Sequence, residues 1–175
     1  MDLGTVERIA ADAVGEPGMR TFYLQARAGA DLVTVIVEKE QVELLARSVL
    51  ELLADIAEET LVTEPGDGGG LEEPIDPRWR AGRLSIGYDR EEDRFLLEIE
   101  EFTPEVEDED DPRSLLIEEP ESISLWASRE QMLALAQHGD TVVGRGRPRC
   151  QFCGNPIDPE GHACPATNGH RTPRT

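Results

Sequence analysis

Two segments of the chain change from strand-like to helix-like spacing of their apolar residues at matching places. Residues 32–46 read LVTVIVEKEQVELLA and residues 122–136 read SISLWASREQMLALA. Each begins as an apolar run typical of a strand and continues with apolar residues three and four positions apart, the spacing of a helix face. We interpret the segments as copies of an internal repeat, because an ungapped alignment pairs Glu40/Glu130, Gln41/Gln131, Leu45/Leu135 and Ala46/Ala136.

The sequence also indicates where the two helices begin and end. Apolar residues recur at helical spacing through residues 42–56, which predicts the first helix. In the second copy, Ser128 and Gln131 have the spacing of a capping box, and we expect the helix to end at Gly139. The first copy has Glu38 at the cap position, a residue type that caps a helix less well.

Strand-like patterns precede both copies. Apolar and polar residues alternate through Thr21–Ala28, and residues 6–13 predict an earlier strand. In the second half, predicted strands at residues 83–88 and 95–102 flank the polar turn 89–93. Tight turns of this kind favour antiparallel pairing.

These patterns predict an α+β body built from two β-β-β-α repeats, at about residues 4–58 and 78–139. The strands are expected to form one antiparallel sheet with both helices on one of its faces. A Gly-rich linker at residues 64–70 joins the repeats. The predicted core consists of the apolar residues on the inward faces: Phe22, Leu24, Val33, Val35, Leu45, Val49, Leu52, Leu84, Ile86, Leu97, Ile99, Ile123, Leu125, Met132 and Leu135.

Charge divides the chain near Gly144. The 175 residues carry a net charge of −20, but residues 1–142 hold 12 basic and 35 acidic side chains, whereas residues 143–175 hold five arginines and two acidic residues. We interpret residues 1–142 as an acidic body and residues 143–175 as a small basic tail. The large negative charge argues against broad binding to nucleic-acid phosphates or anionic lipid. The sequence contains neither a membrane-spanning apolar stretch nor a signal-peptide pattern, so we expect a cytoplasmic protein.

A strongly acidic insertion separates the last two strands of the second half. Residues 103–121 contain nine acidic side chains and one basic side chain, Arg113. Self-repulsion predicts an extended conformation for such a run. It is interpreted either as a solubilising loop or as a landing surface for a basic protein partner. A cation site is disfavoured, because the run lacks the glycine and the regular carboxylate spacing of a calcium loop.

The tail carries the clearest chemical motif. Cys150, Cys153, His162 and Cys164 are spaced C-x2-C-x8-H-x-C. Zinc binds four such ligands in a tetrahedron, so the spacing predicts one structural Zn²⁺ per chain. His170 is an alternative fourth ligand in place of His162. A redox-active cysteine pair is disfavoured because the Gly and Pro residues after Cys153 cannot continue a helix.

Three other features have a functional and a structural interpretation. Residues 145–148, Arg-Gly-Arg-Pro, are similar to the core of an AT-hook but lack its basic flanks, so a basic hinge is the favoured interpretation. His138 is interpreted as a surface or helix-capping residue and not as a catalytic base. The polar side of Thr21–Ala28 is either a recognition face for a small-molecule ligand or a solvated face; its residues are Arg20, Tyr23, Gln25 and Arg27.

Three stretches together resemble the bacterial family catalogued as domain of unknown function number 3090. They are GEPGMRTFYLQARAGADLVTVIVEKEQVELLA, RAGRLSIGYD and GRPRCQFCGNPIDPEGHACPATNGHR. The family's tail pattern, paired cysteines followed by Gly-His-x-Cys-Pro, corresponds to Cys150, Cys153, His162 and Cys164. The resemblance implies a bacterial cytoplasmic protein with a zinc-ribbon-like tail, and it implies no activity.

The sequence therefore favours a non-catalytic, zinc-containing interaction or regulatory protein whose partner is a basic protein. Two alternatives stay open. One is a nucleic-acid-associated factor that uses the basic zinc tail, and the other is an enzyme of unrecognised class. No catalytic residue is assigned, because the phosphate-binding and nucleophile motifs that identify enzymes are absent from the sequence.

Overall fold

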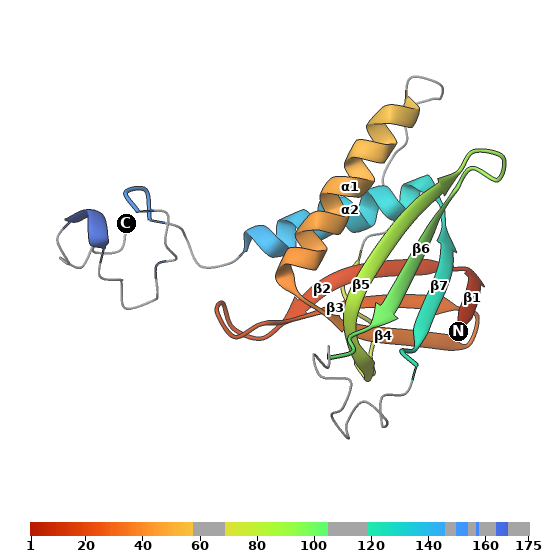
Figure 1. Cartoon of the computed structure of the whole chain (residues 1–175), viewed down its shortest axis with the longest axis horizontal. Helices are drawn as coiled ribbons and strands as arrows, with labels where there is room; N and C mark the ends of the chain where they lie inside the picture. The colour runs from red at the N-terminus through yellow and green to blue at the C-terminus, as the bar shows by residue number, and fades with distance from the viewer. Residues whose placement is uncertain (58–68, 105–118, 146–149, 154–156, 158–163, 168–175) are drawn as a thin grey trace, which may run out of the picture.

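In the computed structural model, the described residues are 1–57, 69–104, 119–145, 150–153, 157 and 164–167 (Figure 1). Within them the chain forms seven strands, two α-helices and a short 3-10 helix, so the body is a mixed α+β structure. The strands are β1 (Asp2–Thr5), β2 (Arg8–Val14), β3 (Thr21–Ala28), β4 (Asp31–Val37), β5 (Pro77–Asp89), β6 (Arg94–Glu101) and β7 (Ser122–Ala127). The helices are α1 (Lys39–Ala57), α2 (Arg129–Gly144) and the 3-10 helix η2 (Pro165–Thr167).

The seven strands form one sheet in the order β1-β7-β6-β5-β4-β3-β2. β1 lies parallel to β7 and β4 lies parallel to β5, while the other neighbours are antiparallel. The prediction of a wholly antiparallel sheet is therefore wrong. The reason is that α1 lies between β4 and β5 in the chain. The connection returns the chain to the end of the sheet at which β4 begins, so that β5 runs parallel to β4.

The sheet curls so that its two ends approach each other. In Figure 1, strands β2 to β4 cross strands β5 to β7 in a second layer. The two-residue connection between β1 and β2 joins both ends of the sheet. The Val6 N–H donates to the Trp126 carbonyl of β7 (2.9 Å), and the Glu7 N–H donates to the Arg27 carbonyl of β3 (2.8 Å). The apolar core therefore lies inside the curl.

The helices are placed differently from the prediction. They pack against each other, α2 lies closely on β2, and α1 makes a looser contact with β5. They do not cover one face of an antiparallel sheet as expected. A flat sheet would need both helices to bury its apolar face, whereas a curled sheet buries most of that face against itself.

Most of the predicted core is buried. Twelve of its fifteen residues are fully buried, and Leu52, Leu84 and Ile86 pack against the cluster at its margin. Further buried residues outside the aligned segments 32–46 and 122–136 were not predicted: Val6, Ile9, Trp79, Phe95 and Val142.

Strand bounds follow the prediction where the alternation is regular. β3 matches the predicted range, and β2 and β6 each differ from it by one or two residues. β5 begins at Pro77, six residues before the predicted start, and the four-residue strand β1 was not predicted. Both missed stretches are the parts that pair in parallel with the other half of the body.

Each α-helix begins with the same polar arrangement. The predicted capping box is present, with the Gln131 N–H donating to the Ser128 hydroxyl and the Ser128 N–H donating to Gln131 Oε1. At the start of α1, the Glu38 N–H likewise donates to Gln41 Oε1 (2.7 Å). The element orders β2-β3-β4-α1 and β5-β6-β7-α2 are also alike. The internal repeat in the sequence stays a prediction.

The predicted end of the second helix is wrong. α2 continues past Gly139 to Gly144, because the turn after Gly139 has its own buried residue, Val142. Gly139 is buried where α2 passes close to its neighbours. A Cβ there would lie 3.1 Å from Val42 Cγ1 and 4.0 Å from Ala11 Cβ. The glycine is therefore used for close packing, which outweighs its low helix propensity.

Candidate metal centre

Three thiols meet in the tail. The Sγ atoms of Cys150, Cys153 and Cys164 all lie within 4.8 Å of one another, and those of Cys150 and Cys164 are 3.8 Å apart. Cys150 and Cys164 are buried, and Cys153 is partly buried. All three are free thiols, since a disulfide would bring two sulfur atoms to about 2.05 Å.

Short turns bring these thiols together. Residues 151–153 form a turn directly after Cys150, and the Phe152 N–H donates to Cys150 Sγ (3.4 Å). Cys164 immediately precedes the 3-10 helix η2. A tight turn after the first cysteine, with backbone N–H groups directed at its sulfur, is the local geometry expected of paired metal-binding cysteines.

The same turn adjusts the acidity of the first thiol. Hydrogen bonds from the backbone N–H groups of Phe152 and Cys153 hold the pKa of Cys150 below its ordinary value. A lower pKa favours the thiolate, which is the form of cysteine that binds metal ions. The three thiols thus lie close enough together to hold a metal ion, and the turn favours the thiolate form of Cys150.

The fourth predicted ligand is not placed. His162 and the alternative His170 both lie outside the described residues, as do residues 146–148 of the AT-hook-like stretch. The structure therefore brings three of the four predicted ligands together and leaves the fourth as a prediction. Residues 105–118 of the acidic insertion and residues 64–68 of the linker also lie outside the described part.

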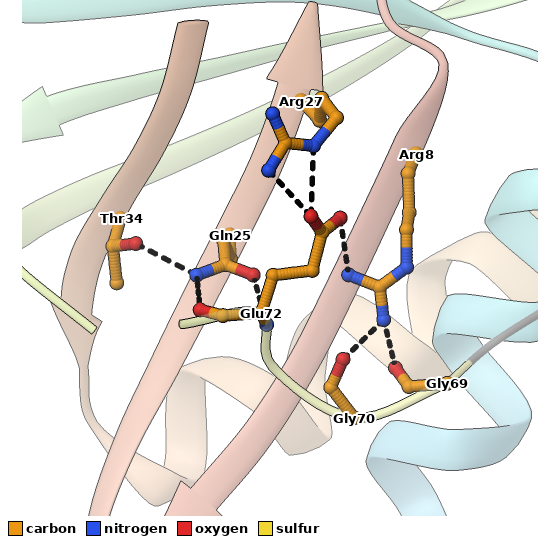
Figure 2. Close-up of polar contacts among 7 residues, drawn as sticks. All are labelled: Arg8, Gln25, Arg27, Thr34, Gly69, Gly70 and Glu72. Atoms are coloured by element: carbon orange, nitrogen blue, oxygen red, sulfur yellow. Dashed lines mark hydrogen bonds and ion pairs between the residues drawn. The ribbon is translucent and has the colours of Figure 1, made fainter. Parts of the chain in front are cut away.

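The predicted recognition face on β3 is covered by another part of the chain. Gln25 is only 1% exposed. Its side-chain amide accepts from the Glu72 N–H (2.7 Å) and donates to the Glu72 carbonyl (3.0 Å) (Figure 2). It also donates to the Thr34 hydroxyl (3.0 Å). Gln25 is therefore neither solvated nor open to a ligand.

Two arginines hold the Glu72 carboxylate beside this amide. Arg27 Nε donates to Glu72 Oε2 (2.8 Å), and Arg8 Nη1 donates to Glu72 Oε1 (3.3 Å). Arg8 also donates to the carbonyls of Gly69 and Gly70 (Figure 2). The hydrogen bond from Arg27, aided by the charge of Arg8, keeps the pKa of Glu72 below its usual range. This cluster fastens the end of the linker to β2 and β3.

Sequence analysis missed this cluster because no local pattern links its members. Glu72 lies 45 residues beyond Arg27 and 64 beyond Arg8. The only signal was the pair of arginines on neighbouring predicted strands, which β2–β3 pairing places opposite each other. On the rest of this face, Arg20 donates to the Val142 carbonyl (2.9 Å) and stacks on the Phe22 ring.

His138 lies within α2 and faces Asp12. Its Nε2 atom is 3.3 Å from Asp12 Oδ2, an ion-pair distance without hydrogen-bond geometry. His138 does not cap the helix as predicted, because α2 extends beyond it to a C-cap at Arg145, and its side chain is a quarter exposed. The pair links α2 to β2.

Comparison with known families identifies the chain. A family model described as "Protein of unknown function (DUF3090)" matches residues 1–164. The chain belongs to this family. The matched range includes the whole body and all three cysteines of the tail, so the thiol cluster is part of the family region. No curated protein and no solved structure was found to match the chain. Among the described residues, no helix has the length and apolar character needed to span a membrane.

Proposed function

We propose that this DUF3090 protein is a non-catalytic interaction or regulatory protein whose tail is folded around one Zn²⁺. The ligands are Cys150, Cys153 and Cys164, with His162 as the fourth. The observation that carries the proposal is the approach of three thiols, from both ends of the tail motif, to within 4.8 Å of one another.

The spacing of the sulfur atoms supports zinc as the metal. With Zn–S bonds of about 2.3 Å, two ligands of a tetrahedral ion lie about 3.8 Å apart. The separation of Cys150 Sγ and Cys164 Sγ is 3.8 Å. Three thiolates with one imidazole form a soft ligand set that is common in structural zinc sites.

A structural role follows from the number of ligands. Catalytic zinc keeps one coordination position open for water or substrate, whereas four protein ligands fill the tetrahedron. The metal then stabilises the fold of the tail and performs no chemistry. The short, Pro- and Gly-rich sequence of the tail contains few apolar residues to form a core, so metal binding contributes most of its folding free energy.

The charge of the chain supports a basic protein as the partner. The body has a net charge of −23, and the segment at residues 103–121 is its most acidic part. Such a charge attracts a basic surface and speeds its association. It also repels nucleic acid, so that binding to nucleic acid depends on the small tail alone.

The partner can be tested by affinity purification from a bacterial lysate with three versions of the full chain. The first is the native chain, and the second replaces the six acidic residues within 105–111 by Asn or Gln. The third, a control of equal net charge, replaces six exposed acidic residues elsewhere on the body: Glu16, Asp31, Asp76, Glu91, Glu92 and Asp140.

The proposal expects a basic protein to be retained by the native chain and by the control, and to be reduced at least fivefold with the 105–111 variant. Added salt should release it from the native chain, since the attraction is electrostatic. Equal retention of the basic protein by all three chains would show that the acidic segment acts only as a solubilising loop. Retention of nucleic acid through the tail would favour the alternative function.

A further inference from the structure

A cleft opens between α1 and β5, far along the chain from the tail cysteines. Its volume is about 280 Å³. It is lined by Gln41, Leu44, Leu45, Ser48, Gly82, Arg83, Leu84 and Ile86. Leu45 is buried in its floor, Leu84 and Ile86 are half-buried, and Leu44 is 56% exposed at its rim. The cleft thus offers an apolar surface that the described body leaves open.

One wall of the cleft is a strand edge without a neighbouring strand. The pairing of β5 with β4 ends at Arg80, opposite Ile36, because the chain then turns into α1. Beyond that point β5 pairs with β6 on one side only, from Arg83 to Asp89. In the described part of the chain, no strand pairs with the other side of this stretch. Its backbone N–H and C=O groups there are a template for an added strand.

The cleft lies along the edge of β5 and not on one of its faces. Its lining includes Arg83 and Leu84, whose side chains point to opposite faces because neighbouring residues alternate in a strand. The free stretch begins just after Gly82, because the Gln41 amide donates to the carbonyls of Ala81 (3.3 Å) and Gly82 (3.2 Å). A chain entering the cleft would meet strand backbone on one side and α1 on the other.

Comparison with the other helix explains why the cleft is open. Gln131 of α2 donates to Val6 as Gln41 of α1 donates to Ala81, so the two contacts can be compared position by position. Eight residues after each glutamine stand Gly139 in α2 and Val49 in α1. Five residues after each acceptor stand Ala11 in β2 and Ile86 in β5. The glycine lets α2 approach Ala11 of β2 closely, and α1, which has larger residues at the corresponding positions, makes a looser contact with β5.

We propose that this cleft binds an extended peptide, which adds as a strand to the free edge of β5. Main-chain hydrogen bonds to residues 83–88 would supply much of the affinity. An aliphatic or aromatic side chain would occupy the apolar cleft beside Leu44, Leu45 and Leu84. The helix–strand groove and the unpaired edge together favour an extended chain, since a bound helix cannot satisfy the hydrogen-bonding groups of the strand.

The charge of Arg83 favours a peptide with an acidic residue next to its apolar side chain. Arg83 at the rim is 72% exposed, and its ion pair with Glu100 is at the limit of interaction, 4.0 Å. A carboxylate beside the apolar side chain would pair with this arginine, so the peptide carries an Asp or Glu at that place. A second copy of the chain fits less well, because each copy carries a net charge of −20 and the copies repel each other.

The proposal is tested with a random eight-residue peptide library displayed on phage and selected against the full chain. Selected peptides are then synthesised and titrated against four variants. Leu44→Glu and Arg83→Glu alter the cleft. Leu50→Glu is the control for the first, as another exposed leucine of α1 outside the cleft, and Arg78→Glu is the control for the second.

We expect enriched peptides with an apolar residue next to an acidic one. Leu44→Glu should weaken their binding at least tenfold and Arg83→Glu about fivefold, while both control variants bind as the native chain does. The amides of residues 83–88 should exchange hydrogen more slowly in the complex. N-methylation of alternate peptide amides should abolish binding in one of the two registers only.

Three outcomes would overturn the proposal. The first is a selection that gives no Leu44-dependent peptide, and the second is binding that tolerates N-methylation in both registers. The third is a dimer of the chain that Leu44→Glu dissociates, which would assign the cleft to a second copy. The cleft lies in the body, so Cys153→Ser should leave peptide binding unchanged. Peptide binding by the cleft and zinc binding by the tail can therefore be tested separately.

Discussion

The body and the tail of this chain hold their structure in different ways. The body encloses a continuous apolar core in which Phe95, Leu97 and Leu125 are completely buried. Among the described residues of the tail, the two buried side chains of Cys150 and Cys164 are thiols, whereas Phe152 is 60% exposed and Ile157 is partly exposed. Apolar burial therefore stabilises the body, and we propose that a metal ion bound by the thiols stabilises the tail.

This difference explains how one chain combines the two parts. Apolar burial is a collective effect, so the body loses stability in proportion to the volume removed from its core. A metal-centred tail depends on a few ligands, so loss of one ligand removes most of its stability. The comparison predicts that mutations in one part leave the other nearly unaffected, and the predictions below are ordered by their expected effect on the body.

The largest effect is expected from a cavity in the core. Leu97→Ala should lower the free energy of unfolding of the body by about 2–5 kcal/mol, because Leu97 is completely buried. Urea denaturation followed by circular dichroism measures the change. The zinc content of the folded variant should equal that of the native chain. A parallel loss of zinc from the folded protein would show that the tail depends on the body's packing.

A smaller effect is expected from the polar group that begins α2. Gln131 completes the capping box, and its amide also donates to the Val6 carbonyl (3.0 Å) where β1 passes into β2. Gln131→Ala should therefore cost about 0.5–2 kcal/mol by the same measurement. Gln137→Ala, at an exposed position of the same helix, is the control and should be neutral. Equal losses of stability in the two variants would show that the capping box of Gln131 does not stabilise the body.

A pH-dependent effect is expected from Glu72, whose carboxylate pairs with Arg8 and Arg27. The pKa of Glu72 is lowered from 4.5 in the folded protein, chiefly by its hydrogen bond with Arg27. Its contribution to stability is then present above that value and is lost as the pH falls through the lower pKa of the folded state. Glu72→Gln should be less stable than the native chain at pH 7, and the difference should shrink below pH 4.5. A constant difference from pH 7 to pH 3.5 would contradict the lowered pKa.

The smallest effect on the body is expected from the tail itself. Cys153→Ser should leave the free energy of unfolding of the body within about 1 kcal/mol of the native value, because no described residue beyond Val143 belongs to the apolar core or packs against it. The same variant should make the tail sensitive to limited proteolysis. Mass spectrometry locates the cuts, which should fall after residue 145. Cuts distributed over the body would contradict the independence of the two parts.

The sequence predicted the elements whose patterns are local. The alternation in Thr21–Ala28 and the capping box at Ser128 are both present as predicted. Both rest on spacing within a few residues, where strand and helix periods differ clearly. The α+β class and the approach of three cysteines also followed from local runs of residues.

Features that depend on distant segments were missed or wrong. The apolar and polar residues of β1 and of the start of β5 alternate over too short or too irregular a stretch to predict a strand. These stretches form strands because they pair in parallel with β7 and β4. Gly139 has the local features of a helix end, yet α2 continues past it because Val142 in the next turn is buried. The polar face of β3 reads as solvated, although Glu72 covers Gln25. Each of these outcomes is decided by tertiary contacts that a local pattern does not contain.

The central claim, that one zinc ion organises the tail, is tested most directly by elemental analysis of the full chain purified without added metal. The account predicts about one equivalent of zinc per chain, strongly reduced in His162→Ala and unchanged in the matched variant His170→Ala. Loss of zinc in His170→Ala alone would show that His170, and not His162, is the fourth ligand. Absence of bound metal from the native chain, with all three thiols reacting freely with a thiol reagent, would contradict the account.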